Sequence, residues 1–291
     1  MVLPKVDASR LGRGPTSQAA TANNMATLTL NQDGTTTERP ASVEPHSLLR
    51  QEVPGNSPNI TVDRDIEAED NRTQIVDASR YPFSSVGLPW TKNKQDIWAT
   101  CSATLIGPKT VITAAHCVYD VDGNGWANDI VFVPAAVDAQ SAPYGKFGWA
   151  HVSILKGFAQ NYDGNYASVM PWDIAEIELI EDVGAKVGWM GFRVDKGSQF
   201  DAVLVGYPGD KPDGTMWESI CIVPPSSFGD HTFTHTCATS AGSSGSAMFE
   251  NDGRGDPFIR GIAVAEDASG SPNYAVRLTE SYYHFLIDNY R

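Results

Sequence analysis

The short stretch Gly242-Ser-Ser-Gly-Ser246 constrains this chain most, because it places a hydroxyl among residues small enough for a tight turn. Such a turn can hold the side chain of Ser244 outward and direct the backbone amides of Gly242 and Ser244 at one point, where a tetrahedral oxyanion would be stabilised. A serine alone is a poor nucleophile, so a catalytic interpretation also requires a histidine base and a carboxylate that orients the histidine. Taken alone, the stretch is also compatible with a Gly/Ser turn between two strands.

Two upstream segments supply the missing partners. The β-branched run Val111-Ile-Thr113 leads through small residues to His116. Asp173 stands at the start of a predicted strand, and apolar residues follow it in that strand. Asp163 is the competing carboxylate, but its neighbours are typical of a loop. The order histidine, aspartate, serine along the chain is that of the chymotrypsin-type triad. The α/β-hydrolase alternative requires Gly-x-Ser-x-Gly, and Ser246 stands where its last glycine belongs.

The chain resembles the glutamyl endopeptidases, a branch of the chymotrypsin-like serine proteases. The matching motifs are Ile106-Gly-Pro-Lys-Thr-Val-Ile-Thr-Ala-Ala-His-Cys-Val-Tyr-Asp120, Asp173-Ile-Ala-Glu-Ile-Glu-Leu179, Gly206-Tyr-Pro-Gly-Asp-Lys211, Gly242-Ser-Ser-Gly-Ser246 and, similar to the segment near that family's mature N-terminus, Tyr81-Pro-Phe83. The resemblance spans the chain from about Thr73 to the C-terminus. It implies two six-stranded antiparallel β-barrels with the active site between them and a C-terminal helix. It also implies a secreted enzyme that is made as a zymogen, acts on polypeptide substrates, and needs no metal or other cofactor.

The same resemblance assigns roles to individual residues. Ser244 is expected to be the nucleophile, His116 the general base, and Asp173 the residue that orients the base. The amides of Gly242, Ser243 and Ser244 are expected to form the oxyanion hole. This combination predicts a serine endopeptidase. Two alternatives remain, namely a catalytically inactive homologue that serves as a binding module and an esterase with the same triad.

The predicted substrate pocket departs from the family. Glutamyl endopeptidases read a substrate glutamate with a histidine on the strand after the nucleophile and with a Thr or Ser shortly before it. Thr239 matches the second position, whereas Ala265 stands where the histidine is expected. Glu266 and Asp267 follow at once, and a carboxylate near the pocket would repel an acidic side chain. We therefore predict weak or absent preference for glutamate at P1, the residue before the cleaved bond, and a small, apolar or basic residue instead, unless Arg277 supplies the missing charge.

Charge and aromatic residues are unevenly distributed. The 291-residue chain has a formal net charge of −14, which disfavours nucleic acid and anionic membranes as partners. Residues 1–64 contain six basic and six acidic side chains and no aromatic residue, so residues 65–291 carry the whole net charge. A segment without aromatics and rich in Thr, Ser, Asn and Pro buries little apolar surface. We therefore predict a poorly structured, propeptide-like extension over 1–64, cleaved near Arg64 or Arg72, and a monomeric protease domain over 65–291.

The four cysteines favour an oxidising, extracellular compartment. We expect Cys101 to pair with Cys117, beside the histidine, and Cys221 to pair with Cys237, ahead of the nucleophile turn. Each bridge would close a short loop and stabilise the fold by about 3 kcal/mol. No Cys-x-x-Cys spacing indicates zinc, and no apolar run is long enough to span a membrane. The first residues lack the apolar core of a signal peptide, so we expect a signal to have been removed.

Short apolar runs separated by Gly, Pro, Asn and Asp predict an all-β fold from residue 75 onward. The expected strands cover residues 97–105, 110–115, 130–133, 173–180, 202–206, 219–223, 247–250, 259–265 and 274–278. A helix is expected over 280–290, with Thr279 as its N-cap. The loop 120–129 has the oxygen spacing and the glycine of half a calcium loop, but Val131 stands where the terminal glutamate belongs. An ordinary surface loop is the alternative there.

Overall fold

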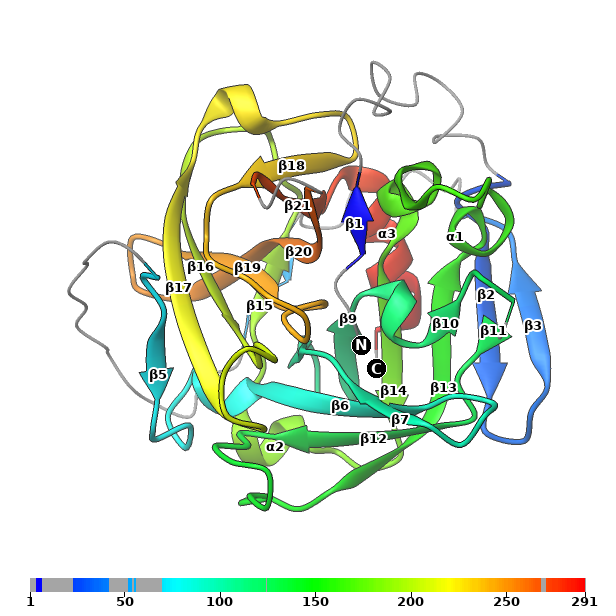
Figure 1. The fold of residues 1–291 in the computed structure, drawn as a ribbon, viewed down its shortest axis with the longest axis horizontal. Coiled ribbons are helices and arrows are strands. Elements are labelled where there is room, and N and C mark those ends of the chain that lie inside the picture. The colour runs from blue at the N-terminus through cyan, green and yellow to red at the C-terminus, as the bar shows by residue number, and fades with distance from the viewer. Residues whose placement is uncertain are drawn as a thin grey trace.

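The computed structural model describes residues 4–6, 23–41, 52–53, 55, 70–123, 125–267 and 271–290. These residues form two large β-sheets side by side, with few helices (Figure 1). The sheets are mostly antiparallel, and a small hairpin of β10 (Tyr119–Asp120) and β11 (Gly125–Trp126) stands apart from them. The all-β prediction is confirmed.

The first sheet closes into a barrel. Its strands are β6 (Val86–Lys92), β8 (Ala103–Leu105), β9 (Thr110–Thr113), β12 (Asp129–Pro134), β13 (Phe147–Leu155) and β14 (Ala175–Leu179), with the short β7 (Trp98–Thr100) paired to β6. They are hydrogen-bonded in the order β12-β6-β8-β9-β14-β13, and β12 pairs with β13 as well, so six strands form a closed ring. Apolar side chains such as Leu105, Ile112 and Ile177 are fully buried in its core.

The second sheet carries the turn of residues 242–246, which is called the nucleophile turn after the role predicted for Ser244. Its main strands are β16 (Phe200–Gly206), β17 (Met216–Val223), β18 (Thr232–His235), β19 (Ala247–Asn251), β20 (Pro257–Asp267) and β21 (Asn273–Arg277), with β5 (Thr73–Ile75) beside β17 and β15 (Gly191–Arg193) beside β20. The order of the main strands is β18-β21-β20-β19-β16-β17. The disulfide between Cys221 of β17 and Cys237, just after β18, joins the two ends of this order. The predicted arrangement of two six-stranded units is therefore confirmed, and the second unit is linked at its ends by a covalent bond.

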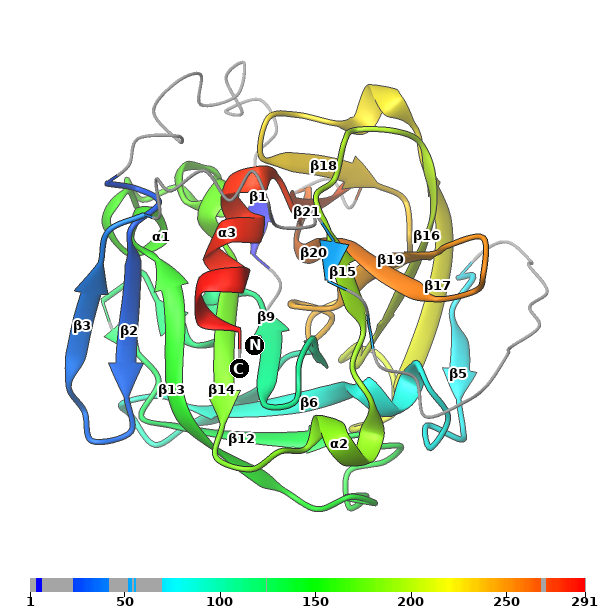
Figure 2. The same ribbon diagram turned by 180° about the vertical axis from the view of Figure 1, so that it is seen from behind.

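Three α-helices accompany the sheets in the described part of the chain, namely α1 (Lys156–Gln160), α2 (Gly184–Val187) and α3 (Glu280–Asn289). The C-terminal helix α3 follows Thr279 as predicted and faces the viewer in Figure 2. Its buried Tyr282 donates a hydrogen bond to the carbonyl of Pro171 at 2.5 Å. This contact fixes the helix against the turn that leads into Asp173. Among the described helices, none has the length and apolar character needed to cross a bilayer.

The N-terminal extension contributes strands to both sheets. β1 (Lys5–Val6) pairs with β20, and β4 (Glu52–Val53) pairs with β15. β2 (Thr27–Asn31) pairs with β13, and β3 (Thr36–Arg39) pairs with β2. Leu30 is buried, and Glu38 forms an ion pair with Lys156 at 2.7 Å. The described residues of the extension thus differ from the poorly structured segment that we expected. The reason is that Thr and Leu alternate with the period of a strand in β2, and the edge of β13 offers it hydrogen bonds.

Candidate active site

Neighbouring strands bring His116 and Asp173 together. β9 leads into the 3-10 turn η3 (Ala115–Cys117), which carries His116, while Asp173 stands just before β14. Since Thr113 of β9 pairs with Ala175 of β14, both side chains lie at the same end of the two strands. The Asp173 carboxylate accepts the backbone N–H of His116 at 2.8 Å through Oδ1, and its Oδ2 lies 2.6 Å from His116 Nδ1. Asp173 is fully buried, so water does not compete for this contact.

Tyr166 adds another donor to Asp173, which sequence reasoning missed. Its hydroxyl donates to Asp173 Oδ2 and lies 3.2 Å from His116 Nδ1. Burial, reinforced by the Asp173 carboxylate, raises the pKa of the Tyr166 hydroxyl well above its usual value, which keeps this donor protonated. Asp163, the competing carboxylate, is exposed and accepts the N–H of Asn165 at 2.9 Å instead. No local sequence signal marks Tyr166, because the tertiary fold alone brings its loop to the histidine.

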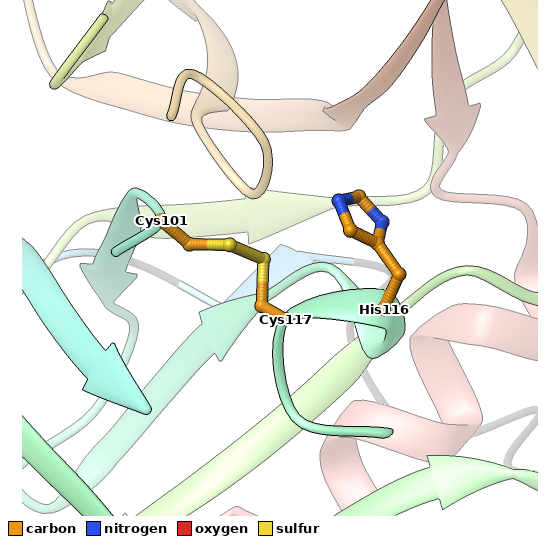
Figure 3. Close-up of side chains that lie close together, drawn as sticks. All are labelled: Cys101, His116 and Cys117. Carbon is orange, nitrogen blue, oxygen red and sulfur yellow. A yellow bond between two sulfur atoms is a disulfide. The ribbon is translucent and has the colours of Figure 1, made fainter. Parts of the chain in front are cut away.

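The Cys101–Cys117 disulfide lies close to His116 (Figure 3). Its Cα atoms are 6.2 Å apart, and those of Cys221–Cys237 are 5.0 Å apart. Both predicted pairings are therefore confirmed. Because Cys117 is the residue after His116, the first bridge restrains the turn that carries the histidine.

Two groups of side chains in the described residues have the spacing of a metal site. Each consists of one histidine and the two cysteines of a disulfide, with His116 in one group and His235 in the other. Metals bind the thiolate form of cysteine, so the donor set of neither group fits a metal. The described carboxylates of the loop 120–129 form no further group of this kind. Within that loop, Asp120 accepts the N–H of Asp122 at 2.9 Å, as in an ordinary turn.

The nucleophile turn is a tight loop ahead of β19. Gly242 has a φ of +94°, in the left-handed region that favours glycine. The N–H of Ser243 donates to the carbonyl of Ser240 at 2.9 Å. The amides of Gly242 and Ser244 donate to no backbone carbonyl among the described residues. These two amides can therefore bind a substrate oxygen, whereas the Ser243 amide lines the loop but is already engaged.

Ser102 ties the nucleophile turn to the first barrel. It stands between β7 and β8, where we expected one unbroken strand. Its N–H donates to the carbonyl of Ser244 at 2.8 Å. Its hydroxyl donates to the carbonyl of Gly242 and accepts the N–H of Tyr207, both at 2.8 Å. This fully buried residue thus contacts the backbone of both proposed oxyanion-hole residues, and sequence reasoning did not identify it.

A cavity of about 410 Å³ adjoins His116. Its lining includes aromatic and acidic side chains and two residues of the extension, among them Tyr119, Trp126, Tyr166, Asp120, Asp122, Pro4 and Lys5. His116 Nε2, the atom that would receive a proton, is buried and has no hydrogen-bond partner among the described residues. Hydrogen bonds of catalytic groups often tighten only when substrate binds, so this geometry is compatible with a base.

The predicted pocket residues flank the nucleophile turn in sequence. The Thr239 hydroxyl is buried and has no hydrogen-bond partner in the described part of the chain. Ala265 is buried on β20, where it pairs with Tyr274 of β21. Arg277 forms an ion pair with the buried Asp195, whose Oδ2 lies 2.5 Å from Arg277 Nε. The Arg277 guanidinium is therefore engaged by a carboxylate.

The family model for trypsin matches residues 75–286, so the chain belongs to the trypsin family. It is a chymotrypsin-like serine endopeptidase related to the glutamyl endopeptidases, and proteases of this family act on polypeptides. A glutamyl endopeptidase of Bacillus licheniformis is 29% identical over 232 residues, which cover 77% of this chain and 69% of that protein.

Two further proteins are similar. A Bacillus subtilis protein named extracellular metalloprotease is 30% identical over 223 residues, which cover 74% of this chain and 66% of that protein. The chain thus spans about two thirds of the length of these curated relatives. The solved structure of a Glu endopeptidase in complex with MPD aligns with a TM-score of 0.65 at 23% identity, covering 77% of this chain and 99% of the other. That likeness shows a shared fold.

Proposed function

We propose that the protein cleaves peptide bonds with a triad of Ser244, His116 and Asp173. The observation that carries this proposal is the buried Asp173 carboxylate, which contacts both the backbone N–H and Nδ1 of His116. Such a contact favours the tautomer with its proton on Nδ1. Nε2 then carries the lone pair that a general base needs.

In the proposed reaction, Ser244 Oγ attacks the scissile carbonyl carbon while His116 Nε2 takes the hydroxyl proton. The amides of Gly242 and Ser244 stabilise the resulting oxyanion. The C–N bond then breaks, and His116 returns the proton to the leaving amine. Water attacks the acyl-enzyme by the same route and releases the carboxylic acid product. Asp173 stabilises the imidazolium that forms in each half of the cycle.

The proposed P1 specificity does not include a strong preference for glutamate. Ala265 offers no hydrogen bond, the Thr239 hydroxyl is a neutral donor, and Arg277 is engaged by Asp195. A pocket without a cation does not offset the desolvation of a carboxylate. A mixed peptide library tests this part, and we expect cleavage after small, apolar or basic residues. Cleavage confined to sites after glutamate would contradict it.

The proposal also covers processing and location. We propose a secreted, monomeric zymogen in which a cut separates the extension, 1–64, from the protease domain, 65–291. Of the two candidate sites, Arg72 is disfavoured because its side chain is 9% exposed and forms ion pairs with Asp70 and Asp210 at 2.5 and 2.6 Å. Arg64, which lies outside the described residues, is the better candidate. Sequencing the new N-terminus after autolysis tests this choice.

Hydrolysis of casein by three forms of the protein tests the function. We compare wild type with Ser244→Ala and with Ser246→Ala, a matched control in the same turn whose buried hydroxyl has no partner among the described residues. Ser244→Ala should lose about 10³-fold or more in rate, and Ser246→Ala should stay within about tenfold of wild type. A chelator should leave the rate unchanged, a control suggested by the name of the Bacillus subtilis relative, extracellular metalloprotease.

Three results would contradict the proposal. A wild-type protein that hydrolyses neither casein nor simple esters would be an inactive homologue. Hydrolysis of esters without casein would indicate an esterase. Equal rates for wild type and Ser244→Ala would mean that the nucleophile lies elsewhere.

A further inference from the structure

The hairpin of β2 and β3 adds two strands to the first barrel. β2 pairs with β13 over five residues, Thr27–Asn31 against 151–155, and β3 pairs with the other edge of β2. Both views show the two strands beside β13, on the outside of the barrel (Figures 1 and 2). β14 occupies one edge of β13, and β12 pairs with residues 147–148. Without the hairpin, the backbone of residues 151–155 would therefore present an unpaired edge.

The hairpin is specified by its own sequence. Asp33 and Gly34 form its turn, where Gly34 has a φ of +85° and Asp33 Oδ1 accepts the N–H of Thr35 at 2.9 Å. An Asp-Gly turn between two extended segments is a strong short-range signal for a hairpin. The shape of the hairpin therefore does not depend on the chain that follows β3.

The residues just before β2 complete the start of helix α1. The carbonyl of Ala26 accepts the N–H of Lys156 at 2.7 Å, and that of Asn24 accepts the N–H of Gly157 at 2.9 Å. The first N–H groups of a helix have no partner within the helix, and the N-cap side chain of α1 forms no hydrogen bond to them. α1 in turn packs against the 3-10 turn η5 (Met170–Trp172), which leads into the buried carboxylate of the candidate site.

The end of β3 contacts the C-terminal helix. Arg39 Nη1 donates to the carbonyl of Asp288 at 3.1 Å, and its Nη2 donates to Asn289 Oδ1 at 2.9 Å. α3 is the helix whose Tyr282 bonds the carbonyl of Pro171 in η5. The hairpin thus contacts both helices that contact this turn.

One face of the segment is buried, and the other is not. Met25 and Leu30 are 7% and 9% exposed and belong to the hydrophobic core of the barrel. Every residue of β3 is exposed. Release of the segment would expose apolar surface, which is unfavourable in water. The described lining of the cavity beside His116 includes no residue of 23–41, so the segment leaves that cavity open.

We propose that residues 23–41 stay bound after the extension has been cut, so that the processed protein consists of two chains held together without a covalent bond. The edge of β13 and the ends of α1 and α3 form the interaction surface, and its partner is the hairpin of the same chain. A cut at Arg64 lies beyond Arg39 and breaks none of the bonds described above. The natural cut rests on the processing proposed above, whereas the binding of the hairpin does not.

Retention is measured on the full chain with two changes. Ser244→Ala prevents self-cleavage, and a recognition sequence for an unrelated site-specific protease is inserted after Arg64. After complete cleavage, the amino-terminal fragment should co-elute with the protease domain in gel filtration at about 1 µM protein, and the two should separate in urea. The melting temperature of the cut protein should rise with protein concentration, because its fragment can dissociate, whereas that of the uncut chain should not.

Two variants of the hairpin assign the retention to these residues. Leu30→Asp places a carboxylate in the core and should weaken binding of the cut fragment at least about tenfold, so that it elutes separately. Thr37→Asp is the matched control at an exposed position of β3 and should co-elute. If uncut Leu30→Asp does not fold, as judged by its melting curve, Arg39→Ala replaces it. Its cut fragment should dissociate about fivefold faster than that of Thr37→Asp.

Separate elution of the cut fragment with an unmodified hairpin would overturn the inference. So would a melting temperature of the cut protein that does not change with concentration. Equal retention of Thr37→Asp and the hairpin-weakening variant would show that another part of the extension holds the fragment. Failure of the proposed function has a different signature: the chain with Ser244 intact would be inactive and would remain uncut, yet the fragment released by the inserted site would still co-elute.

Discussion

The half of the molecule that carries His116 and Asp173 differs from the half that carries Ser244 in how its functional groups are positioned. In the first half, contacts between side chains position the groups within one closed barrel, since Asp173 contacts His116 directly. His116 follows β9, and Asp173 precedes β14, which pairs with β9. In the second half, the turn around Ser244 is shaped by backbone hydrogen bonds and is tied to the first barrel by Ser102. The pair of His116 and Asp173 is thus formed within one half, whereas the position of Ser244, the proposed nucleophile, depends on the contact between the halves.

The largest expected effect lies in the first half. Asp173→Asn preserves the shape of the carboxylate but no longer selects the Nδ1–H tautomer of His116, so kcat should fall by about 10⁴-fold. Asp163→Asn is the matched control in the preceding loop and should change the rate by less than about twofold. Steady-state kinetics on one peptide substrate measures both. A loss of kcat in Asp163→Asn alone would show that Asp163, and not Asp173, orients the histidine.

The two disulfides sharpen the comparison, because each spans a sequence separation of 16 residues. Replacing either pair by alanine should lower the free energy of unfolding by about 3 kcal/mol, as judged by urea denaturation. The loss of activity should differ. Removal of Cys101–Cys117 should reduce kcat in the folded protein because it releases the turn of His116, while removal of Cys221–Cys237 should leave kcat near wild type. The opposite ranking of kcat values would break the comparison.

Burial of His235, in the second half, should make the free energy of unfolding depend on pH. Burial lowers the pKa of His235 to about 3, so this histidine is neutral in the folded protein near neutral pH. Its ordinary pKa in the unfolded chain is about 6.5, so the unfolded state binds the proton first as pH falls. Between pH 7 and pH 5 this group should lower stability by about 2 kcal/mol. The His235→Leu variant should therefore lose less free energy of unfolding between pH 7 and pH 5, as measured by urea denaturation. If the free energy of unfolding depends on pH identically in both proteins, the lowered pKa of His235 is wrong.

Ser102→Ala tests the contact between the halves. Loss of the hydroxyl leaves the carbonyl of Gly242 and the N–H of Tyr207 without this partner, so kcat should fall by about tenfold while KM changes little. Ser102→Thr, which retains a hydroxyl, should recover part of the rate. Ser153→Ala is the control, because Ser153 is equally buried but bonds the hydroxyl of Thr29 in the extension. Equal effects of the two alanine variants on kcat would show that Ser102 has no special role.

The sequence was sufficient to predict those features whose signal lies in neighbouring residues. The run before His116, the strand after Asp173 and the glycines around Ser244 each carry a recognisable pattern, and the structure places the first two side chains in contact. The disulfides were predictable because each pair is close in sequence. The terminal helix was predictable from its apolar spacing after Thr279.

The rest required tertiary information. Tyr166 and Ser102 act through partners that only folding brings near, so their immediate neighbours gave no sign of their contacts. β6 and β13 were missed because polar, glycine or proline residues interrupt their apolar runs, although both strands are largely buried in the barrel. The lack of aromatic residues in the extension led us to expect little structure. Yet β2 is held by hydrogen bonds to the edge of β13 and does not need a hydrophobic core of its own.

Labelling with a fluorophosphonate, followed by peptide mapping, tests the central claim most directly. The reagent reacts with a serine only when that serine is activated by a neighbouring base. We predict stoichiometric modification of Ser244, with none on Ser243 or Ser246, and a loss of modification in His116→Ala despite an unchanged fold. Absence of label on Ser244 in the processed protein, under conditions that label trypsin fully, would contradict the account.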